Sequence, residues 1–272
     1  MKRGNKTAFI GTGFMARAMI GGIVDSGVRS PGDIFTVNPV DRESAVEVSS
    51  LYGVRMGEIG DLSGADVVVF AIKPQQFDEA LAMYREFLSP DKLYLSIMAG
   101  ITTDRLEAGI PGAAVVRLMP NLALSVGKSS TAYAPGKLAT EDDCSVVEEL
   151  FSVLGTVLRV DEEMISSVTA LSGSGPAYFC LLTEKLAEAA AAQGMDRATA
   201  DALALSTLIG TAKLLSGGET TPEELRRRVT SKKGTTEAGV GAMLASGFAE
   251  AVADGFNAAR VRSDELSAPD KG

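Results

Sequence analysis

The stretch TAFIGTGFMARAM, residues 7–19, joins a short apolar run to a helical pattern through two closely spaced glycines. Its first four residues predict a buried strand, and the apolar spacing over residues 14–27 predicts a helix that ends at Gly27. Between them, Gly11 to Ala16 reads G-x-G-x-x-A. In a strand-turn-helix context this pattern is typical of a dinucleotide site, because the glycines let backbone amides approach a pyrophosphate at the helix N-terminus.

Short apolar runs and helical patterns continue to alternate through the first half of the chain. Further strands are expected at 33–38, 66–72, 93–100 and 113–119, with helices at 75–88 and 102–109. Apolar strands joined by helical crossovers predict a parallel sheet covered on both faces. From about Met164 onward the pattern is helical, with segments at 174–193 and 196–216. We therefore expect an α/β protein with an N-terminal Rossmann-type domain at residues 1–162 and an all-α domain at residues 163–272.

The composition excludes several classes of function. With 46% hydrophobic and 22% charged residues in 272, the chain reads as a soluble globular protein. A net charge of −9 argues against a nucleic-acid partner, which needs a basic surface. The chain has no histidine, so Ser-His-Asp catalysis and imidazole metal sites are excluded, and we expect no metal. We find no signal-like apolar start and no run of about 18 apolar residues, which predicts no membrane association and a cytoplasmic location.

The glycine turn and the neighbouring strand ends supply the candidate cofactor-binding residues. They are Gly11, Thr12, Gly13, Phe14, Met15, Asn38, Arg42, Ala71, Ile72, Lys73, Pro74, Met98, Ala99 and Asn121. NAD-specific sites place Asp or Glu at the end of the second strand, where this chain has Asn38, with Arg42 one helical turn further on. We therefore expect NADPH as the cofactor, with NADH possible. Alternatively, Asn38-Pro39 only ends the strand and caps the next helix.

The segment VTSKKGTTEAG, residues 229–239, precedes another helical run. Gly234, Thr235 and Thr236 would contribute the first free amides of that helix, which suits a carboxylate, and the two threonine hydroxyls add donors. The alternative is a capped surface turn with two solvated lysines. Elsewhere in the helical half, amphipathic faces that contain Met243, Leu244, Phe248 and Phe256 predict self-association, and we expect this domain to be an oligomerisation domain.

Five motifs occur in one order along the chain: FIGTGFMARAM, AIKP, MPN, GSGPAY and VTSKKGTTEAG. In this order, over about residues 7–266, the chain resembles the pyrroline-5-carboxylate reductase family, which closes proline biosynthesis. The resemblance implies NAD(P)H, a small imino-acid substrate, and a homodimer through the C-terminal helices, with higher homo-oligomers in some members. It also implies that Ser231, Gly234, Thr235 and Thr236 bind the substrate carboxylate and that Thr236 is the catalytic contact to the ring nitrogen.

The chain departs from the family pattern at two places. Relatives usually read S-P-G-G-T-T where this chain has Lys232 and Lys233 after Ser231, and Leu122-Ala123 replaces a Thr-Pro after Asn121. A reductase of another cyclic imino acid, or a non-catalytic dinucleotide-binding relative, therefore remains an alternative. A β-hydroxyacid dehydrogenase is disfavoured, because it needs a lysine in a G-x-x-G-x-x-x-K pattern and Lys185 lies too far after Gly173.

Overall fold

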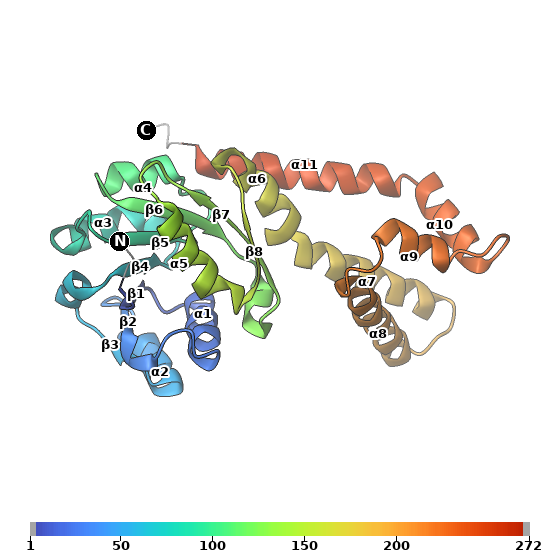
Figure 1. Cartoon of the computed structure of the whole chain (residues 1–272). Helices are drawn as coiled ribbons and strands as arrows, with labels where there is room; N and C mark the ends of the chain where they lie inside the picture. The colour runs from blue at the N-terminus through green and yellow to red at the C-terminus, as the bar shows by residue number, and fades with distance from the viewer. Residues whose placement is uncertain (1–3, 269–272) are drawn as a thin grey trace. The chain divides into compact units, whose positions relative to one another are not determined.

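The computed structural model of the protein describes residues 4–268 (Figure 1). Contacts divide the chain into two compact units. The first comprises the residues up to Ser174 together with those from Ala259 onward, and the second comprises Gly175–Ala258. The domain boundary predicted between residues 162 and 163 stays a prediction.

The first unit contains an eight-stranded sheet in the order β3-β2-β1-β4-β5-β6-β7-β8. Its strands are β1 Thr7–Ile10, β2 Ile34–Val37, β3 Arg55–Met56, β4 Val67–Phe70, β5 Leu93–Ser96, β6 Ala114–Met119, β7 Ser129–Pro135 and β8 Gly155–Arg159. All neighbouring strands pair in parallel except β6 and β7, which are antiparallel. The predicted α/β class with an N-terminal parallel sheet is therefore confirmed.

Helices cover both faces of this sheet. The α-helices are α1 Phe14–Asp25, α2 Arg42–Tyr52, α3 Phe77–Tyr84, α4 Thr103–Gly109, α5 Glu141–Ser152 and α6 Ile165–Val168. Shorter turns are η1 Pro31–Asp33, η2 Ile59–Gly64, η3 Pro74–Gln76, η4 Arg85–Phe87, η5 Leu122–Val126, η6 Glu162–Met164 and the π-helical η7 Thr169–Gly173. Side chains alternate along each strand, so Phe9 packs in a core with α1, α2 and α5 while Ala8 and Ile10 pack with α3 and α4.

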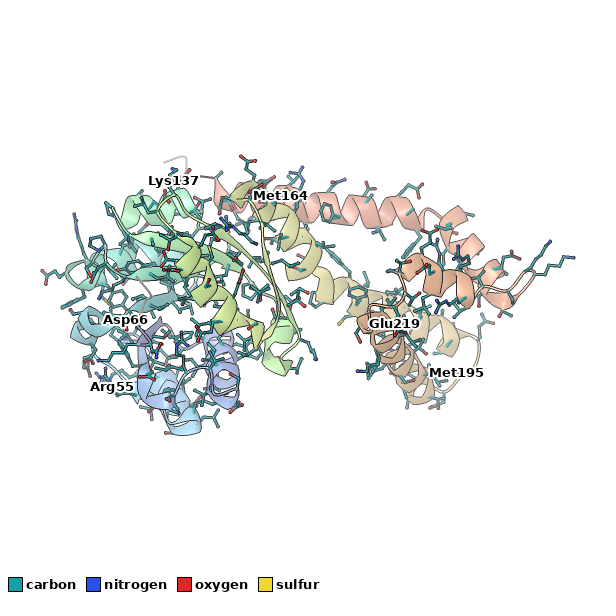
Figure 2. The ribbon with its side chains drawn as sticks, viewed as in Figure 1. Arg55, Asp66, Lys137, Met164, Met195 and Glu219 are labelled. Atoms are coloured by element: carbon teal, nitrogen blue, oxygen red, sulfur yellow. The ribbon has the colours of Figure 1, made fainter. Side chains whose placement is uncertain are left out.

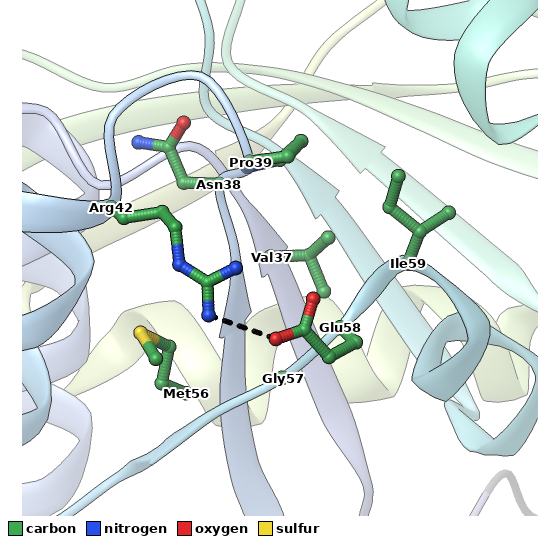
Figure 3. A pocket seen from close by; sticks show the side chains of 8 residues that line it. All are labelled: Val37, Asn38, Pro39, Arg42, Met56, Gly57, Glu58 and Ile59. Atoms are coloured by element: carbon green, nitrogen blue, oxygen red, sulfur yellow. Dashed lines mark hydrogen bonds and ion pairs between the residues drawn. The ribbon is translucent and has the colours of Figure 1, made fainter.

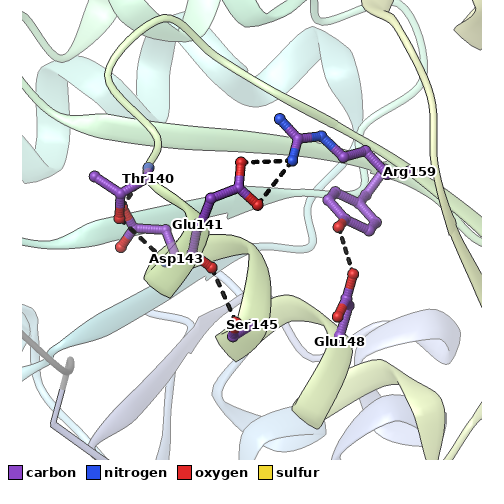
Figure 4. Close-up of polar contacts among 7 residues, drawn as sticks. Thr140, Glu141, Asp143, Ser145, Glu148 and Arg159 are labelled. Carbon is purple, nitrogen blue, oxygen red and sulfur yellow. Dashed lines mark hydrogen bonds and ion pairs between the residues drawn. The ribbon is translucent and has the colours of Figure 1, made fainter.

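A polar network at the start of α5 fixes this helix against the edge of the sheet (Figure 4). Thr140 and Asp143 form a capping box, in which the Thr140 amide donates to Asp143 Oδ2 at 2.9 Å. Arg159 of β8 pairs with Glu141 of α5 at 2.7 Å. Helix α5, which connects the parallel strands β7 and β8, is thus linked to β8 by an ion pair.

The second unit is helical, as predicted. It contains α7 Gly175–Ala192, α8 Arg197–Ser216, α9 Pro222–Arg228, α10 Thr235–Ala245 and the beginning of α11 Phe248–Ser267. Figure 2 marks Met195 and Glu219, which lie in the turns before and after α8. Helix α9 begins after Thr221, which is its N-cap and forms a capping box with Glu224.

Helices α7 and α8 expose large apolar side chains. These include Phe179, Leu181, Leu186, Leu203, Leu205, Ile209 and Leu214. Helix α8 has the length and composition of a membrane span, with a mean hydropathy of 1.2 and 6% of the window buried within the chain. The sequence has no unbroken run of about 18 apolar residues, but α8 passes this test of length and mean hydropathy although Asp201 and Lys213 interrupt it.

Candidate functional site

The turn between β1 and α1 has the backbone that a dinucleotide requires. Gly11 has a φ of +97°, and a Cβ there would lie 2.7 Å from the Ala71 carbonyl oxygen, so a side chain would collide with the end of β4. Gly13 is the N-cap of α1, and a Cβ at Gly13 would meet nothing within 4 Å. Helix α1 also has no acidic residue in its first turn. An incoming pyrophosphate can therefore approach the amides at this helix N-terminus, and the residues fit a nicotinamide dinucleotide.

A pocket of about 280 Å³ opens beside this turn. Seven of the expected cofactor-binding residues line it: Gly11, Thr12, Gly13, Asn38, Ala71, Ile72 and Lys73. Its other lining residues are Val40, Asp41, Gln76, Glu79, Ala80, Met83 and Tyr84. The ends of β1, β2 and β4 thus meet at one edge of the sheet, as the sequence predicts.

The other expected cofactor-binding residues lie outside this pocket: Phe14, Met15, Arg42, Pro74, Met98, Ala99 and Asn121. Phe14 is exposed and lines a separate pocket of about 400 Å³ between α1 and residues 124–127. Met98 is 2% exposed and belongs to the core. The Asn121 side chain accepts from the Ala123 amide at 3.2 Å and donates to the Ser172 carbonyl at 3.0 Å. Its amide is thus already used within the chain, and a role in cofactor binding stays a prediction.

Asn38 has both of its side-chain polar atoms engaged within the chain. Its Nδ2 donates to Thr12 Oγ1 at 2.7 Å, and its Oδ1 accepts from the Asp41 amide at 3.1 Å. Thr12 Oγ1 also lies 2.7 Å from Ser44 Oγ, which places α2 in the same network. The N-cap of α2 is Asp41, whose side chain accepts from the Ser44 amide. The alternative that Asn38 caps this helix is therefore wrong, and its side chain instead fixes the glycine turn.

Arg42, the first residue of α2, forms an ion pair with Glu58 at 2.9 Å (Figure 3). Together with Asp41, which lines the dinucleotide pocket, Glu58 places a second carboxylate near the end of β2. The strand-end position itself holds Asn38, so both carboxylates come from neighbouring segments. The sequence shows Asp41 three positions after Asn38. Glu58, in contrast, follows β3, and no local sequence pattern indicates that it pairs with Arg42.

The loop before α10 begins with a tight turn. The Gly234 amide donates to the Ser231 carbonyl at 3.0 Å, and Lys233 has a φ of +60°. Lys233 is the only non-glycine residue with a positive φ among residues 4–268. A turn with a left-handed third residue favours glycine there and proline at the position before it, which is held here by Lys232. The Pro-Gly usual in relatives is thus the ideal occupant of this turn.

The N-terminus of α10 leaves backbone amides free, and Glu237 in its first turn accepts from the Lys233 amide at 2.7 Å. Gly234 is its N-cap, and a Cβ there would lie 2.4 Å from Ser231 Oγ, so the tight turn requires glycine. Thr235 and Thr236 are the first residues of the helix, and their amides have no carbonyl partner within it. The expectation of three free amides is wrong for Gly234, whose amide is used in the turn. The predicted helix start at this position is confirmed.

Metal binding was not expected from the sequence. Within the part of the chain that the structure describes, no three His, Cys, Asp or Glu side chains gather in a group that could hold a metal ion. The candidate residues are instead backbone amides, hydroxyls and cationic side chains. Such groups bind phosphates and carboxylates.

Two family models match the chain. A model of pyrroline-5-carboxylate reductase dimerisation matches residues 162–266, which include the exposed helices α7 and α8. A model described as NADP oxidoreductase, coenzyme F420-dependent, matches residues 6–100, which include the glycine turn. The helical region therefore matches a dimerisation domain, and the sheet region matches a nicotinamide-dinucleotide oxidoreductase.

Curated relatives and solved structures agree with these models. Pyrroline-5-carboxylate reductase 1 of Bacillus spizizenii is 36% identical over 265 residues, covering 96% of this chain and 89% of the relative. The Pseudomonas aeruginosa enzyme is 37% identical over 267 residues, covering 96% and 97%. The structure of the Coxiella burnetii reductase matches with a TM-score of 0.92 and 31% identity over 97% of this chain and 99% of that chain. A Plasmodium falciparum pyrroline carboxylate reductase with NADP bound matches with a TM-score of 0.84 and 25% identity over 98% and 100%. The chain belongs to the pyrroline-5-carboxylate reductase family.

Proposed function

We propose that this chain reduces L-1-pyrroline-5-carboxylate to L-proline with NADPH, which is the last step of proline biosynthesis. The observation that carries the proposal is the similarity to curated pyrroline-5-carboxylate reductases along 96% of the chain. The glycine turn at Gly11 to Gly13 and the threonines at the start of α10 support it from the site geometry.

The dinucleotide site uses the first turn of α1. We expect the amides of Gly13, Phe14 and Met15 to bind the pyrophosphate at this helix N-terminus, and the hydrogen bond from Asn38 to Thr12 supports the turn. Bound NADPH supplies the hydride. A Plasmodium falciparum relative has NADP bound, and Arg42 offers a cation for a 2′-phosphate, so we propose that NADPH is preferred over NADH.

The substrate site is the loop of Ser231, Gly234, Thr235 and Thr236. The amides of Thr235 and Thr236 bind the imino-acid carboxylate at the positive end of α10. The Thr236 hydroxyl contacts the ring nitrogen. Gly234 contributes by permitting the turn, because its own amide is bound to the Ser231 carbonyl.

The reaction suits a chain without histidine. Reduction of a cyclic imine adds a hydride to the C=N carbon and leaves a proton on the nitrogen. An imine of moderate basicity enters already protonated, so hydride addition to the iminium gives the neutral amine, which takes a further proton from water. The chain then needs to orient the ring and balance its carboxylate charge, and such positioning supplies a large part of the rate.

The chain forms homo-oligomers, and we propose a homodimer through the C-terminal helices, with higher homo-oligomers possible. This assignment explains why the apolar side chains of α7 and α8 are exposed in one chain. We further propose a cytoplasmic location and a small-molecule substrate rather than a nucleic acid or a membrane.

The test is an assay of the purified protein with NADPH and L-1-pyrroline-5-carboxylate. We expect NADPH oxidation with formation of one proline per NADPH consumed. A six-membered cyclic imino acid serves as the comparison substrate, because the loop and Leu122-Ala123 departures bear on ring size. A higher kcat/KM for the six-membered ring would assign another substrate, and NADPH binding without turnover of either ring would make the chain a non-catalytic relative.

A further inference from the structure

The Arg42–Glu58 ion pair lies in solvent at the edge of the dinucleotide site. The Arg42 side chain is 59% exposed and that of Glu58 is 71% exposed. Exposed pairs of this kind are weak, because water screens both charges. A phosphate binds a guanidinium more strongly, since it carries more charge and offers several acceptor oxygens. Arg42 is therefore free to exchange Glu58 for a bound phosphate.

The location of this pair corresponds to the ribose 2′ position of a dinucleotide. The small pocket around it is lined by Val37, Asn38 and Pro39 at the end of β2 and by residues 56–59, which start at the last residue of β3 (Figure 3). Asn38 also lines the larger dinucleotide pocket, so the two pockets adjoin. In strand-helix-strand dinucleotide sites, the ribose 2′ group is read at the end of the second strand.

The charges that line the small pocket oppose each other. Among the described residues around it, Arg42 is the only cation and Glu58 the only anion. Asp41 adds a further carboxylate in the adjoining pocket, but its Oδ1 is bound to the Ser44 amide as the helix cap. A 2′-phosphate that binds Arg42 therefore has to displace the Glu58 carboxylate, whereas the 2′-hydroxyl of NADH carries no charge.

We propose that Glu58 is a specificity-determining residue, which competes with the 2′-phosphate of NADPH for Arg42 and so limits the preference for NADPH over NADH. This inference rests on the proposed use of a nicotinamide dinucleotide. It assigns Glu58 a role that differs from a direct contact with the ribose. The proposal requires that the Glu58 carboxylate leaves Arg42 when NADPH binds.

The experiment measures the Kd of NADPH and NADH by fluorescence titration, with no imino acid present. The variants are Glu58→Gln, Arg42→Gln and the double variant. Glu58→Gln keeps the side-chain shape, and the Glu58 backbone amide still donates to Asp61 Oδ2, so the fold is preserved. Glu141→Gln is the matched control. Glu141 also pairs with an exposed arginine, Arg159, and this pair lies at a distant edge of the sheet.

We expect Glu58→Gln to tighten NADPH binding by about three- to tenfold and to leave NADH within about twofold. In the Arg42→Gln background, Glu58→Gln should no longer tighten NADPH selectively. Unchanged NADPH affinity, or equal tightening in Glu141→Gln, would overturn the proposal. Weaker NADH binding in Glu58→Gln would also overturn it, by showing that Glu58 accepts from the ribose 2′-hydroxyl. If the native protein prefers NADH, the proposed cofactor preference fails, but selective tightening by Glu58→Gln still supports this inference.

Discussion

Asn38 donates from its side-chain Nδ2 to Thr12 Oγ1 at 2.7 Å, and this bond joins the end of β2 to the glycine turn after β1. Thr12 is 2% exposed, so the bond is shielded from water. Asn38 thereby holds the turn in place, and its side chain is not available to bind a ligand without breaking this contact. The residue that sequence reasoning assigned to cofactor choice therefore has a structural role as well.

Replacing Asn38 with Asp should weaken NADPH binding more than NADH binding. The new carboxylate lies beside the expected 2′-phosphate and repels it, while the donor to Thr12 is lost for both cofactors. Asn38→Ala removes the donor without adding charge, so the difference between the two variants isolates the repulsion. We expect Asn38→Asp to lower the NADPH to NADH affinity ratio by about tenfold relative to Asn38→Ala. Equal ratios in a fluorescence titration would contradict this prediction.

Replacing Lys233 with Gly should stabilise the chain. Lys233 has a φ of +60°, and a left-handed backbone at a residue with a side chain costs about 1 kcal/mol. Urea unfolding should show a gain of about that size, reduced by the extra freedom of glycine in the unfolded state. Lys232→Gly is the control, because Lys232 has no positive φ and should lose stability instead. A loss of stability in Lys233→Gly would refute the proposed strain.

The Pro-Gly double replacement at Lys232 and Lys233 restores the turn that relatives usually have. We expect the variant to remain active, because the Ser231 to Gly234 hydrogen bond does not use the Lys232 amide. It removes two exposed cations, so kcat/KM for the anionic substrate should depend less on salt. An identical salt dependence in steady-state kinetics would show that these lysines do not attract the substrate.

The sequence predicted the elements with strong local signals. Strands β4 to β6 are mainly apolar, interrupted only by Ser96 in β5 and Arg117 in β6, and the glycine turn has a motif of its own. Strand β3 has only two residues, Arg55 and Met56, and is too short to give a periodic pattern. Strand β8 is largely exposed, and its residues lack the apolar run that marks a buried strand. Neither strand was predicted, because neither has the local apolar pattern of a buried strand.

The candidate site was predictable to a similar extent. The residues at Gly11 to Gly13 and at Thr235 lie in continuous motifs, so their positions followed from the order of strands and helices. The contact between Arg42 and Glu58 joins residues 16 positions apart on different elements. No periodicity marks such a pair, and only the tertiary structure brings its charges together. The hydrogen bond from the Gly234 amide to the Ser231 carbonyl likewise could not be predicted from the sequence, because it depends on the backbone conformation of the turn.

Replacing Ile209 with Lys should dissociate the oligomer. Ile209 lies on α8 and is 60% exposed in one chain, so the proposed dimer interface would bury a charge without a partner. Light scattering of the native protein should give at least twice the 28.3 kDa of one chain, and the variant should give a lower mass. Leu138→Lys is the control, since Leu138 is 53% exposed in the sheet unit and should have no effect. A native mass of one chain would contradict the proposed assembly.

Replacing Tyr133 with Phe should change how stability depends on alkaline pH. Burial, assisted by the Glu148 carboxylate that accepts from its hydroxyl at 2.7 Å, raises the pKa of Tyr133 well above its ordinary value of 10.0. The unfolded chain therefore loses this proton first, and the native protein loses stability as the pH rises above 10.0. The Tyr133→Phe variant has no hydroxyl to ionise, so this contribution to the pH dependence of its stability is absent.

At neutral pH the same variant should lose about 1 kcal/mol, because one hydrogen bond is removed and the exposed Glu148 regains water. Urea unfolding from pH 7 to 11 measures both effects. The free energies of unfolding of the two proteins should converge as the pH rises. Parallel curves would show that Tyr133 ionises alike in the folded and unfolded chains.

Thr236→Val in a steady-state assay with L-1-pyrroline-5-carboxylate tests the substrate site most directly. The change removes the hydroxyl with little change in volume, and one hydrogen bond to a charged group is worth ~1.5–3 kcal/mol, or roughly 10- to 150-fold in kcat/KM. We predict a fall of this size with an unchanged Kd for NADPH, recovery in Thr236→Ser, and no effect of Thr156→Val on an exposed strand. Unchanged kinetics in Thr236→Val would contradict the account and would leave the loop before α10 as a capped surface turn.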